Sequence, residues 1–329
     1  MRIGVAGVGR IGTMHAANLA ALDQVDEVLL YDPVEGRAAA AAAPGMRAVP
    51  RLSDLLAQSD GVLVATPTDT HPHLVRACLL AGKPVLCEKP IAGDIAAMAA
   101  LVTEVEAADV PVVVGFQRRF DPAMVELHRR ISTGDLGTVY HVRATGFDAQ
   151  PPDFSYLPGS GGIFRDLLIH DLDAVPWLVG EPVVEVYASG SVLVDEAFAA
   201  ADDVDNAVAL LRFEGGAHAV LTAGRHDPLG YDHRIEVLGA RDSVVVGLDS
   251  RTPLNVLGSG GPADAYPGFP ERFQLAYRNE MRVFADIIAG RADNPSPARD
   301  SLLSLRLAEA CDQSRRTGTP VRTVEWSTP

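Results

Sequence analysis

The chain has 329 residues, 47% of them hydrophobic and 22% charged, which is ordinary for a soluble protein with room for two domains. Its formal charge of -15 excludes nucleic-acid backbones and anionic membranes as expected partners, because both need a basic surface, and it fits a neutral or cationic small molecule better. The three cysteines show neither a disulfide framework nor metal-ligand spacing, and no apolar run approaches ~18 residues, so we expect a cytoplasmic protein without a metal site.

The chain begins with a predicted strand, a glycine-rich turn and a helix. An apolar run over residues 3–6 is followed by Gly7-Val8-Gly9-Arg10-Ile11-Gly12 and then by an Ala-rich run over 13–21. In such a turn the first glycine permits the tight bend, the second lets the backbone approach a pyrophosphate, and the third lets the helix pack on the strand. Because a strand precedes the turn and a helix follows it, the pattern predicts a dinucleotide site rather than a merely tight turn.

The second predicted strand, over 28–31, ends at Asp32. An acid at this point accepts hydrogen bonds from the adenosine ribose and repels a 2′-phosphate, so we expect NAD rather than NADP as cofactor. The phosphates would rest on the free N–H groups at the start of the helix, near Arg10 and Ile11. Arg37 is near enough in sequence to reach a phosphate, but we interpret it as a solvated helix residue.

Further strands and helices alternate up to residue 119, and they predict a doubly wound parallel sheet, a Rossmann domain over 1–119. Strands are expected over 62–65, 84–87 and 112–115, with helices over 38–43, 72–81 and 94–108. Ligands of such a sheet bind beyond the carboxyl ends of its strands. Thr66 and Pro67 follow one strand, and Glu88 and Lys89 follow another, so we predict that these four residues border the cofactor. Lys89 could also stabilise an alkoxide that forms as hydride leaves a substrate hydroxyl.

The remainder, residues 120–329, predicts an α+β domain with a large, mostly antiparallel sheet. A Pro- and Gly-rich loop occupies 150–162, and Gly215-Gly216 marks a hairpin turn. Helices are expected over 121–132, 163–179, 271–289 and 298–316, and strands over 138–145, 183–194, 207–213, 217–223, 234–239 and 243–247. We expect this domain to bind the substrate and to join subunits.

The predicted helix over 163–179 carries three titratable residues. Asp166, His170 and Asp173 recur on one face of it. The opposite face is expected to be buried, and it carries Leu168, Leu172, Val175 and Val179. A histidine one turn from a carboxylate can act as a general base whose tautomer the carboxylate fixes. A structural ion pair on a solvated face is an equally open interpretation, and a metal pair is disfavoured because no other ligand pattern supports it. Pro176 predicts a kink or an early end of the helix.

These segments together resemble the Gfo/Idh/MocA oxidoreductases, and within that family the inositol 2-dehydrogenase branch, over nearly the whole chain. The resemblance is carried by the glycine turn over 7–12 and by ATPTDTH (65–71), CEKP (87–90), GFQRRFD (115–121), SGGIFRD (160–166), IHDLD (169–173) and YDHR (231–234). It implies that Lys89 is the catalytic lysine and that Asp166 and His170 are the catalytic pair.

The same resemblance implies substrate contacts for Asp173, Tyr231 and Arg118 or Arg119. Two segments depart from the inositol branch: Gly146-Phe147-Asp148 stands where Ser-Arg-Asp or a segment with His or Asn is usual, and Gly224-Arg225-His226-Asp227 replaces a Ser-Arg-Arg run. We predict that Phe147 lies at the rim of the pocket and favours a substrate with an apolar face or a cationic group. In the alternative interpretation the segment points into solvent, and the substrate is an ordinary inositol.

The expected reaction is the NAD-dependent oxidation of a secondary hydroxyl of a cyclitol or sugar to a ketone. His170 would take the hydroxyl proton, Asp166 would orient the imidazole and Lys89 would stabilise the oxyanion. The alternatives are an NAD(P)H-dependent keto-sugar or imine reductase and an NAD-containing glycosidase or lyase that borrows and returns the hydride. A non-enzymatic sensor is disfavoured, because all three residues are present. We expect a homo-oligomer, specifically a tetramer.

Overall fold

A parallel sheet forms the centre of the first unit in the computed structural model, which describes residues 1–247 and 266–323. Within these residues the sheet has six strands in the order β3-β2-β1-β4-β5-β6, as the Rossmann prediction requires. The strands are β1 (Arg2–Ala6), β2 (Glu27–Tyr31), β3 (Met46–Ala48), β4 (Gly61–Val64), β5 (Val85–Glu88) and β6 (Val112–Gly115). β1 pairs with both β2 and β4, so the winding reverses beside it, and sheets of this kind bind ligands at that point.

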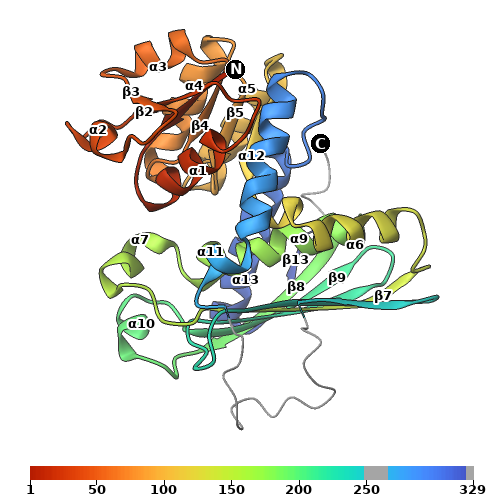
Figure 1. Ribbon diagram of the computed structural model, residues 1–329. Helices are drawn as coiled ribbons and strands as arrows, with labels where there is room; N and C mark the ends of the chain where they lie inside the picture. Colours follow the sequence, from red (N-terminus) through yellow and green to blue (C-terminus); the bar gives the residue numbers. More distant parts are fainter. Residues whose placement is uncertain (248–265, 324–329) are drawn as a thin grey trace. The chain divides into compact units, whose positions relative to one another are not determined.

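The helices that connect these strands (Figure 1) are α1 (Arg10–Ala20), α2 (Arg37–Ala41), α3 (Leu52–Gln58), α4 (His71–Leu80) and α5 (Ile95–Ala107). Two short 3₁₀ helices, η1 (Thr68–Thr70) and η2 (Gln117–Phe120), follow β4 and β6. The sequence did not predict β3 or α3, because both are too short to show a clear hydrophobic period. The other strands begin and end within about two residues of their predicted bounds.

The boundary between the two units differs from the predicted one. Unit 1 comprises residues 1–121 together with 275–302, and unit 2 comprises the rest. The prediction assigned all residues after 119 to the second domain. Residues 275–302 belong to unit 1 because helix α12 (Gln274–Ile288) buries Met281, Phe284 and Ala285 in the core of that unit, a long-range contact that no local pattern shows.

A mostly antiparallel sheet forms the centre of unit 2, as predicted. Its seven described strands lie in the order β12-β11-β7-β10-β9-β8-β13, and only β7 and β10 run parallel. The strands are β7 (Val139–Phe147), β8 (Val183–Ser191), β9 (Asn206–Phe213), β10 (His218–Gly224), β11 (Asp232–Gly239), β12 (Ser243–Val246) and β13 (Val321–Arg322).

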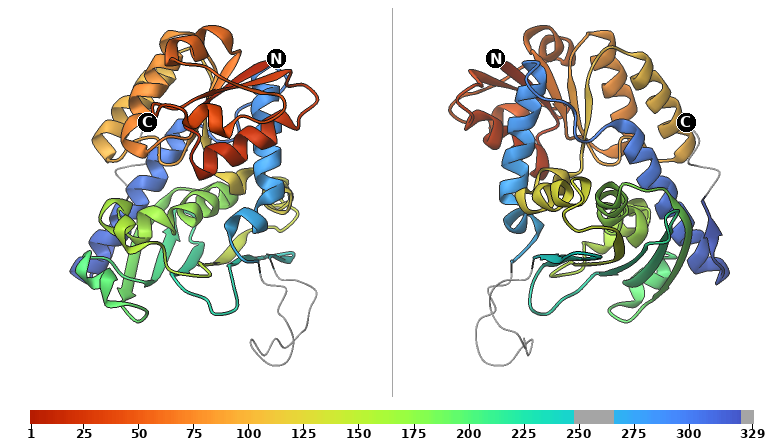
Figure 2. Two further views of the ribbon diagram at one scale, coloured as in Figure 1. Left: turned by 60° about the vertical axis from the view of Figure 1, so that its left-hand side comes forward. Right: turned by 90° about the vertical axis from the view of Figure 1, so that its right-hand side faces the viewer.

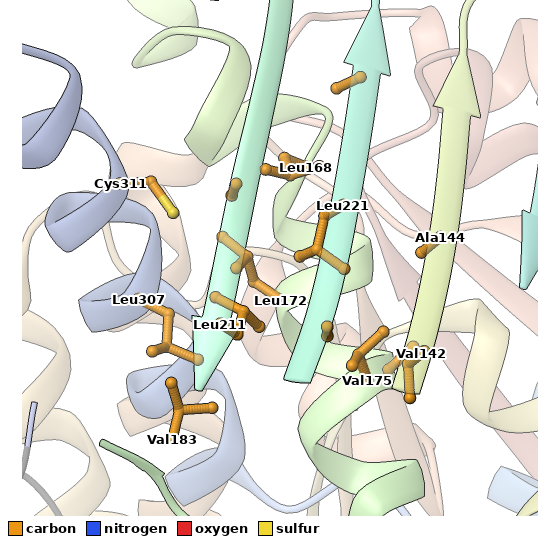
Figure 3. Packing of buried hydrophobic residues seen from close by; sticks show 14 of the residues in the cluster. Val142, Ala144, Leu168, Leu172, Val175, Val183, Leu211, Leu221, Leu307 and Cys311 are labelled. Atoms are coloured by element: carbon orange, nitrogen blue, oxygen red, sulfur yellow. The ribbon is translucent and has the colours of Figure 1, made fainter. Parts of the chain in front are cut away.

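Helices α6 (Pro122–Ser132) and α9 (Ile169–Val179) lie along one face of this sheet (Figure 2). Figure 3 shows Leu168, Leu172 and Val175 directed at side chains of β7, β9 and β10, and Leu307 on α13 (Ala298–Thr317) joins the same core. The remaining elements of the unit are η3 (Phe154–Tyr156), α7 (Leu157–Ser160), α8 (Ile163–Asp166), α10 (Glu196–Ala200) and α11 (Phe269–Arg272). The buried face predicted for the helix over 163–179 is therefore confirmed.

The opposite face of the sheet carries exposed apolar side chains. Tyr187, Leu210 and Val220 occupy adjacent positions on β8, β9 and β10, and each is about two-fifths exposed. Their strand neighbours point the other way into the core, as the two-residue period of a strand requires. We call this row of three side chains the outer row.

The single helix predicted over 163–179 is wrong. The chain forms α8 and α9 instead, and the Leu168 N–H bonds to the Ile163 carbonyl across the junction at 2.8 Å. Asp166 thus ends one helix and His170 lies in the first turn of the next, so the two residues do not share one regular helical face. The early end predicted at Pro176 is also wrong, because α9 continues through this residue to Val179. One missing N–H is tolerated in a helix so well buried on the sheet.

The helix predicted over 271–289 is likewise divided, into α11 and α12. Phe273 stands between them with a fully buried side chain. The packing of Phe273 in the core therefore outweighs the local sequence pattern, which predicted one continuous helix.

Candidate functional site

The glycine turn after β1 has the geometry that a dinucleotide requires. Gly7 adopts φ +92°, and a Cβ there would lie 2.6 Å from the Ala65 carbonyl oxygen. A Cβ on Gly12 would collide with the carbonyl of Gly7, so α1 approaches β1 closely only because this residue is glycine. Beside Gly9, in contrast, a Cβ would meet no atom within 4 Å. The turn is therefore closed at its two ends and open at its middle glycine, where a pyrophosphate would approach the backbone.

Asp32 follows β2, and its carboxylate holds this turn. Its side chain is only 4% exposed, with Oδ2 accepting from the Val8 N–H at 3.1 Å and Oδ1 from the Val34 N–H at 2.9 Å. Arg37, the first residue of α2, is half exposed and places Nη1 3.3 Å from Oδ1. The acid thus occupies the position that binds ribose hydroxyls in such folds, and Arg37 is its ion-pair partner.

His71 joins the two loops that follow β4 and β5. Its Nε2 lies 2.7 Å from the Thr66 carbonyl oxygen, and its Nδ1 lies 2.8 Å from the carbonyl oxygen of Pro90. Carbonyl oxygens only accept hydrogen bonds, so a ring nitrogen that carries a hydrogen donates to the carbonyl oxygen beside it. The buried ring thereby fixes the Thr66-Pro67 turn relative to Lys89, which precedes Pro90. Sequence reasoning missed this residue, although it ends the ATPTDTH segment.

The neighbouring Glu88 is tied to the helix of the glycine turn. Its Oε1 lies 2.6 Å from Nε2 of the buried His15 on α1. Glu280 of α12 is fully buried, and neither of its carboxyl oxygens has a hydrogen-bond partner among the described residues. Burial, together with the charge of Glu88, raises the pKa of Glu280 well above its ordinary value. Burial therefore favours the neutral form of Glu280, whereas Glu88 is paired with His15.

Lys89 is half-buried at the carboxyl end of β5, as predicted. Lys83 and Lys89 are the only lysines in the sequence. The Lys83 ammonium group donates to the Ser59 carbonyl oxygen at 2.8 Å, which leaves Lys89 as the lysine at the ligand-binding edge of the sheet.

Unit 2 contributes a group of charged residues around Asp166, which we call the acid group. Nη1 of Arg225, just after β10, lies 2.9 Å from Oδ2 of Asp166 and 3.3 Å from Oδ2 of Asp148. The Tyr156 hydroxyl donates to Oδ1 of Asp166 at 3.0 Å. Although burial lowers the pKa of Arg225, the charges of Asp166 and Asp148 outweigh it and raise that pKa above its ordinary value.

Two glycines and an aspartate position the short helix α8 that ends at Asp166. Gly161 and Gly162 have φ +80° and +84°, the left-handed region that favours glycine. Oδ1 of the buried Asp203 then accepts from the Ile163 N–H at 3.0 Å, which satisfies a free donor at the helix start. The SGGIFRD segment therefore depends on residues that lie far ahead in the sequence.

The structure places other predicted site residues on α9. His170 is half-buried in the first turn. Asp173 is buried, and the Ser304 hydroxyl lies 3.4 Å from its Oδ1. Asp171, which the sequence analysis did not single out, is also buried. Its Oδ1 lies 3.6 Å from Nε2 of His233.

Tyr231 is buried against the rings of Phe269 and Phe273. Its backbone N–H also donates to the Tyr266 carbonyl oxygen at 2.7 Å. The predicted substrate contacts of Asp173 and Tyr231 stay predictions.

Arg119 and Phe147, two further predicted substrate residues, are held by contacts within their own units. Arg119, in unit 1, is 4% exposed, and its Nη1 lies 2.7 Å from Oδ2 of Asp300. Phe147 lies on the face of the sheet opposite to Val142 and Ala144, and a Cβ at Gly224 would lie 2.8 Å from its ring. The two segments that depart from the inositol branch, 146–148 and 224–227, are thus neighbours on paired strands. Gly224 leaves room for the ring of Phe147. The role of Phe147 in substrate binding stays a prediction.

The Rossmann sheet, the open middle glycine and the buried Asp32 define a dinucleotide-binding protein. Residues 1–116 match the oxidoreductase family with an NAD-binding Rossmann fold, and residues 124–245 match the GFO/IDH/MocA C-terminal domain. The chain belongs to the Gfo/Idh/MocA family of oxidoreductases.

Similar proteins of this family include inositol dehydrogenases. The chain is 39% identical to the myo-inositol dehydrogenase Hyg17 of Streptomyces leeuwenhoekii, over 97% of this chain and 98% of that protein. It is 37% identical to the myo-inositol 2-dehydrogenase of Thermotoga maritima, over 95% and 96% of the two chains. The structure of scyllo-inositol dehydrogenase from Lactobacillus casei with NAD(H) and scyllo-inositol is similar with a TM-score of 0.86 at 26% identity, covering 98% of each chain. Among the described residues, no helix combines the length and apolarity that a membrane crossing demands.

Proposed function

We propose that this protein oxidises a secondary hydroxyl of an inositol-type cyclitol to a ketone with NAD. The observation that carries the proposal is the acid group, in which a buried arginine holds Asp166 near the start of the helix that bears His170. Full-length similarity to myo- and scyllo-inositol dehydrogenases supports the choice of a cyclitol. Buried, unpaired Cys78, Cys87 and Cys311 are compatible with the cytoplasm that we expect.

Bound NAD would supply the hydride acceptor. The free N–H groups at the start of α1 would bind its pyrophosphate, and Asp32 its adenosine ribose. An ionised Asp32 accepts hydrogen bonds from ribose hydroxyls and repels a 2′-phosphate, so NAD is preferred over NADP. Arg37 does not reverse this preference in the proposal, because it is paired with Asp32.

The residues of this chain move the proton and stabilise charge. His170 takes the proton of the substrate hydroxyl as general base. Asp166 remains an ionised acceptor that orients the imidazole or the substrate. The Lys89 ammonium stabilises the negative charge that develops on the substrate oxygen, which a fixed cation in a water-poor site does efficiently. Asp173 and Tyr231 would hold the other hydroxyls of the ring.

The experiment is a comparison of NADH formation from myo-inositol, scyllo-inositol, an amino or deoxy analogue and several aldoses, with NAD and with NADP. We expect NADH to appear with an inositol and NAD. Reduction of keto-sugars or imines without the reverse oxidation would favour a reductase. Product formation without net NADH would favour a glycosidase or lyase. Silence with every polyol would contradict the proposal.

We also propose that copies of this chain associate through the outer row, in a homo-oligomer that we expect to be a tetramer. Exposed contiguous apolar side chains on a sheet face are typical of protein contacts. Leu210→Asp should lower the molar mass measured by light scattering, because it places a charge in the row. Leu80→Asp, at a highly exposed leucine of α4, is the matched control. An unchanged mass in Leu210→Asp would contradict this assignment.

A further inference from the structure

We infer that Arg225 is a positioning residue of the reaction, which keeps Asp166 an ionised acceptor and fixes the orientation of its carboxylate. This inference rests on the proposed function. It concerns the departing segment 224–227, to which the sequence analysis gave no role.

The contacts of Asp166 leave its carboxylate little freedom to rotate. Arg225 engages Oδ2 at 2.9 Å while the Tyr156 hydroxyl engages Oδ1 at 3.0 Å. The backbone of Arg225 is fixed as well, because its N–H donates to the Asp205 carbonyl oxygen at 2.8 Å. One oxygen therefore bonds to a strand-end arginine, and the other to a residue of η3. Contacts on both oxygens thereby fix the plane of the carboxylate toward an imidazole or a substrate hydroxyl.

The charges around Arg225 explain why a cation is needed there. Its side chain is only 2% exposed, and the acids that face it come from three separate segments. Asp166 ends α8, Asp148 follows β7 and Asp203 precedes β9, with the phenol of Tyr156 beyond Asp166. Buried carboxylates without a cation repel one another and lose hydration, which drives one of them to bind a proton. Arg225 removes that tendency from Asp166.

The contacts of Arg225 depend on its positive charge more than on the forked shape of its guanidinium group. Both ion-pair contacts of Arg225 use Nη1, whereas Nε and Nη2 are buried without hydrogen-bond partners among the described residues. A bidentate guanidinium pair tolerates lysine poorly, but here a single donor nitrogen bridges two acids. Lysine should therefore replace the charge of Arg225 in part, and glutamine should not.

The test compares Arg225→Gln, Arg225→Lys and, as a matched control, Arg129→Gln on the exposed face of α6, where Arg129 pairs with Glu126. The readouts are Tm, NAD affinity and the pH profile of kcat/KM with the substrate found for the wild type. In Arg225→Gln we expect kcat to fall at least about tenfold, and the acid limb of the profile to move up by about one pH unit or more. The limb moves up because Asp166 loses the cation that favours its ionised form.

Arg225→Lys should recover part of both effects, and Arg129→Gln should match the wild type. NAD affinity should be unchanged in all three variants. An acid limb and a rate that stay at wild-type values in a folded Arg225→Gln would overturn the inference. A loss of Tm with an unmoved pH profile would show a structural role only and would also overturn it.

A second measurement separates this inference from the proposed function, since it needs no activity. The Tm of Arg225→Gln, Asp166→Asn and the double variant form a cycle. We expect Asp166→Asn to restore part of the Tm that Arg225→Gln loses, because it removes the uncompensated charge. Additive losses would overturn the ionic linkage whether or not the protein oxidises a cyclitol. A coupled cycle in a protein without polyol oxidation would refute the proposed function alone.

Discussion

The two units build their polar sites in different ways. Unit 1 places backbone turns at the ends of neighbouring parallel strands, and side chains such as Asp32 and His71 hold those turns in place. Unit 2 gathers Asp166, Arg225 and Asp148 from segments far apart in the sequence, and their side chains form the site themselves. The first kind of site depends on where the backbone passes, and the second on how charges compensate one another.

The two units also treat acids that are shielded from water differently. Glu280 in unit 1 lies without a hydrogen-bond partner among the described residues, and its pKa is raised mainly by burial. Asp166 in unit 2 has a buried arginine beside it. A buried carboxyl group without a nearby cation binds a proton, and one with a cation stays charged. Chemistry that needs an ionised acceptor is therefore expected from the second unit.

The largest expected effect separates chemistry from cofactor binding. His170→Ala should lower kcat about a hundredfold or more, because a positioned general base contributes 10²–10⁴ in rate. NAD affinity, measured by fluorescence titration, should stay near that of the wild type, because no predicted cofactor-binding residue is changed. A kcat within about threefold of the wild type would remove His170 from the proton transfer.

A substitution in the glycine turn should have the opposite effect: it should change NAD affinity and leave the stability of the fold unchanged. Gly9→Ala adds a methyl group in open space, so Tm should be unchanged while NAD binding weakens about tenfold, or ~1.4 kcal/mol. Gly12→Ala is the matched control: its methyl group meets the carbonyl of Gly7, and Tm should fall. Unimpaired NAD binding by Gly9→Ala would place the pyrophosphate elsewhere.

The same contrast explains what the sequence predicted and what it did not. The glycine turn, Asp32 and Lys89 were found because a cofactor motif is local and has fixed spacing. Arg225 and Asp203 were missed as partners of the Asp166 segment, since nothing in their spacing links them to it.

Two predictions from local sequence patterns were wrong, because the packing of distant residues decides where these helices end and which core they join. The break between α8 and α9 separates Asp166 from His170, although the helical period runs across it. Helix α12 belongs to the core of unit 1, although it follows the strands of unit 2 in the chain.

A smaller effect concerns the choice of cofactor. Asp32→Ser should narrow the preference for NAD over NADP by at least about tenfold, or ~1.4 kcal/mol, because the serine no longer repels a 2′-phosphate. Arg37 would then lose its carboxylate partner and face the phosphate. The measurement is kcat/KM with each cofactor, and a wild-type preference for NADP would show that Asp32 does not decide the choice.

The contrast between buried acids can be tested through stability. A raised folded-state pKa means that Glu280 stabilises the fold fully below its unfolded pKa, near 4.5, and that this stability is lost as pH rises. Glu280→Gln mimics the neutral acid, so it should raise Tm by roughly 2–4 °C at pH 8 and by less at pH 5. An equal change at both pH values would contradict a neutral Glu280.

The smallest effect is expected at Phe147, on the sheet face opposite to the buried Val142 and Ala144. Phe147→Ala should leave the ratio of kcat/KM for myo-inositol to that for a deoxy or amino analogue within about twofold of the wild type. A clear change in this ratio would instead support the pocket-rim role predicted from the sequence.

The scarcity of lysine makes this protein easy to label selectively. An amine-directed acylating reagent has only Lys83 and Lys89 as side-chain targets, and Lys83 lies at the opposite end of strand β5 from Lys89. Intact-mass spectra would count the acyl groups, and peptide mapping would then assign them to Lys83, Lys89 or the N-terminal amine. A label on Lys89 that NAD slows would report occupancy of the dinucleotide turn, independently of any substrate.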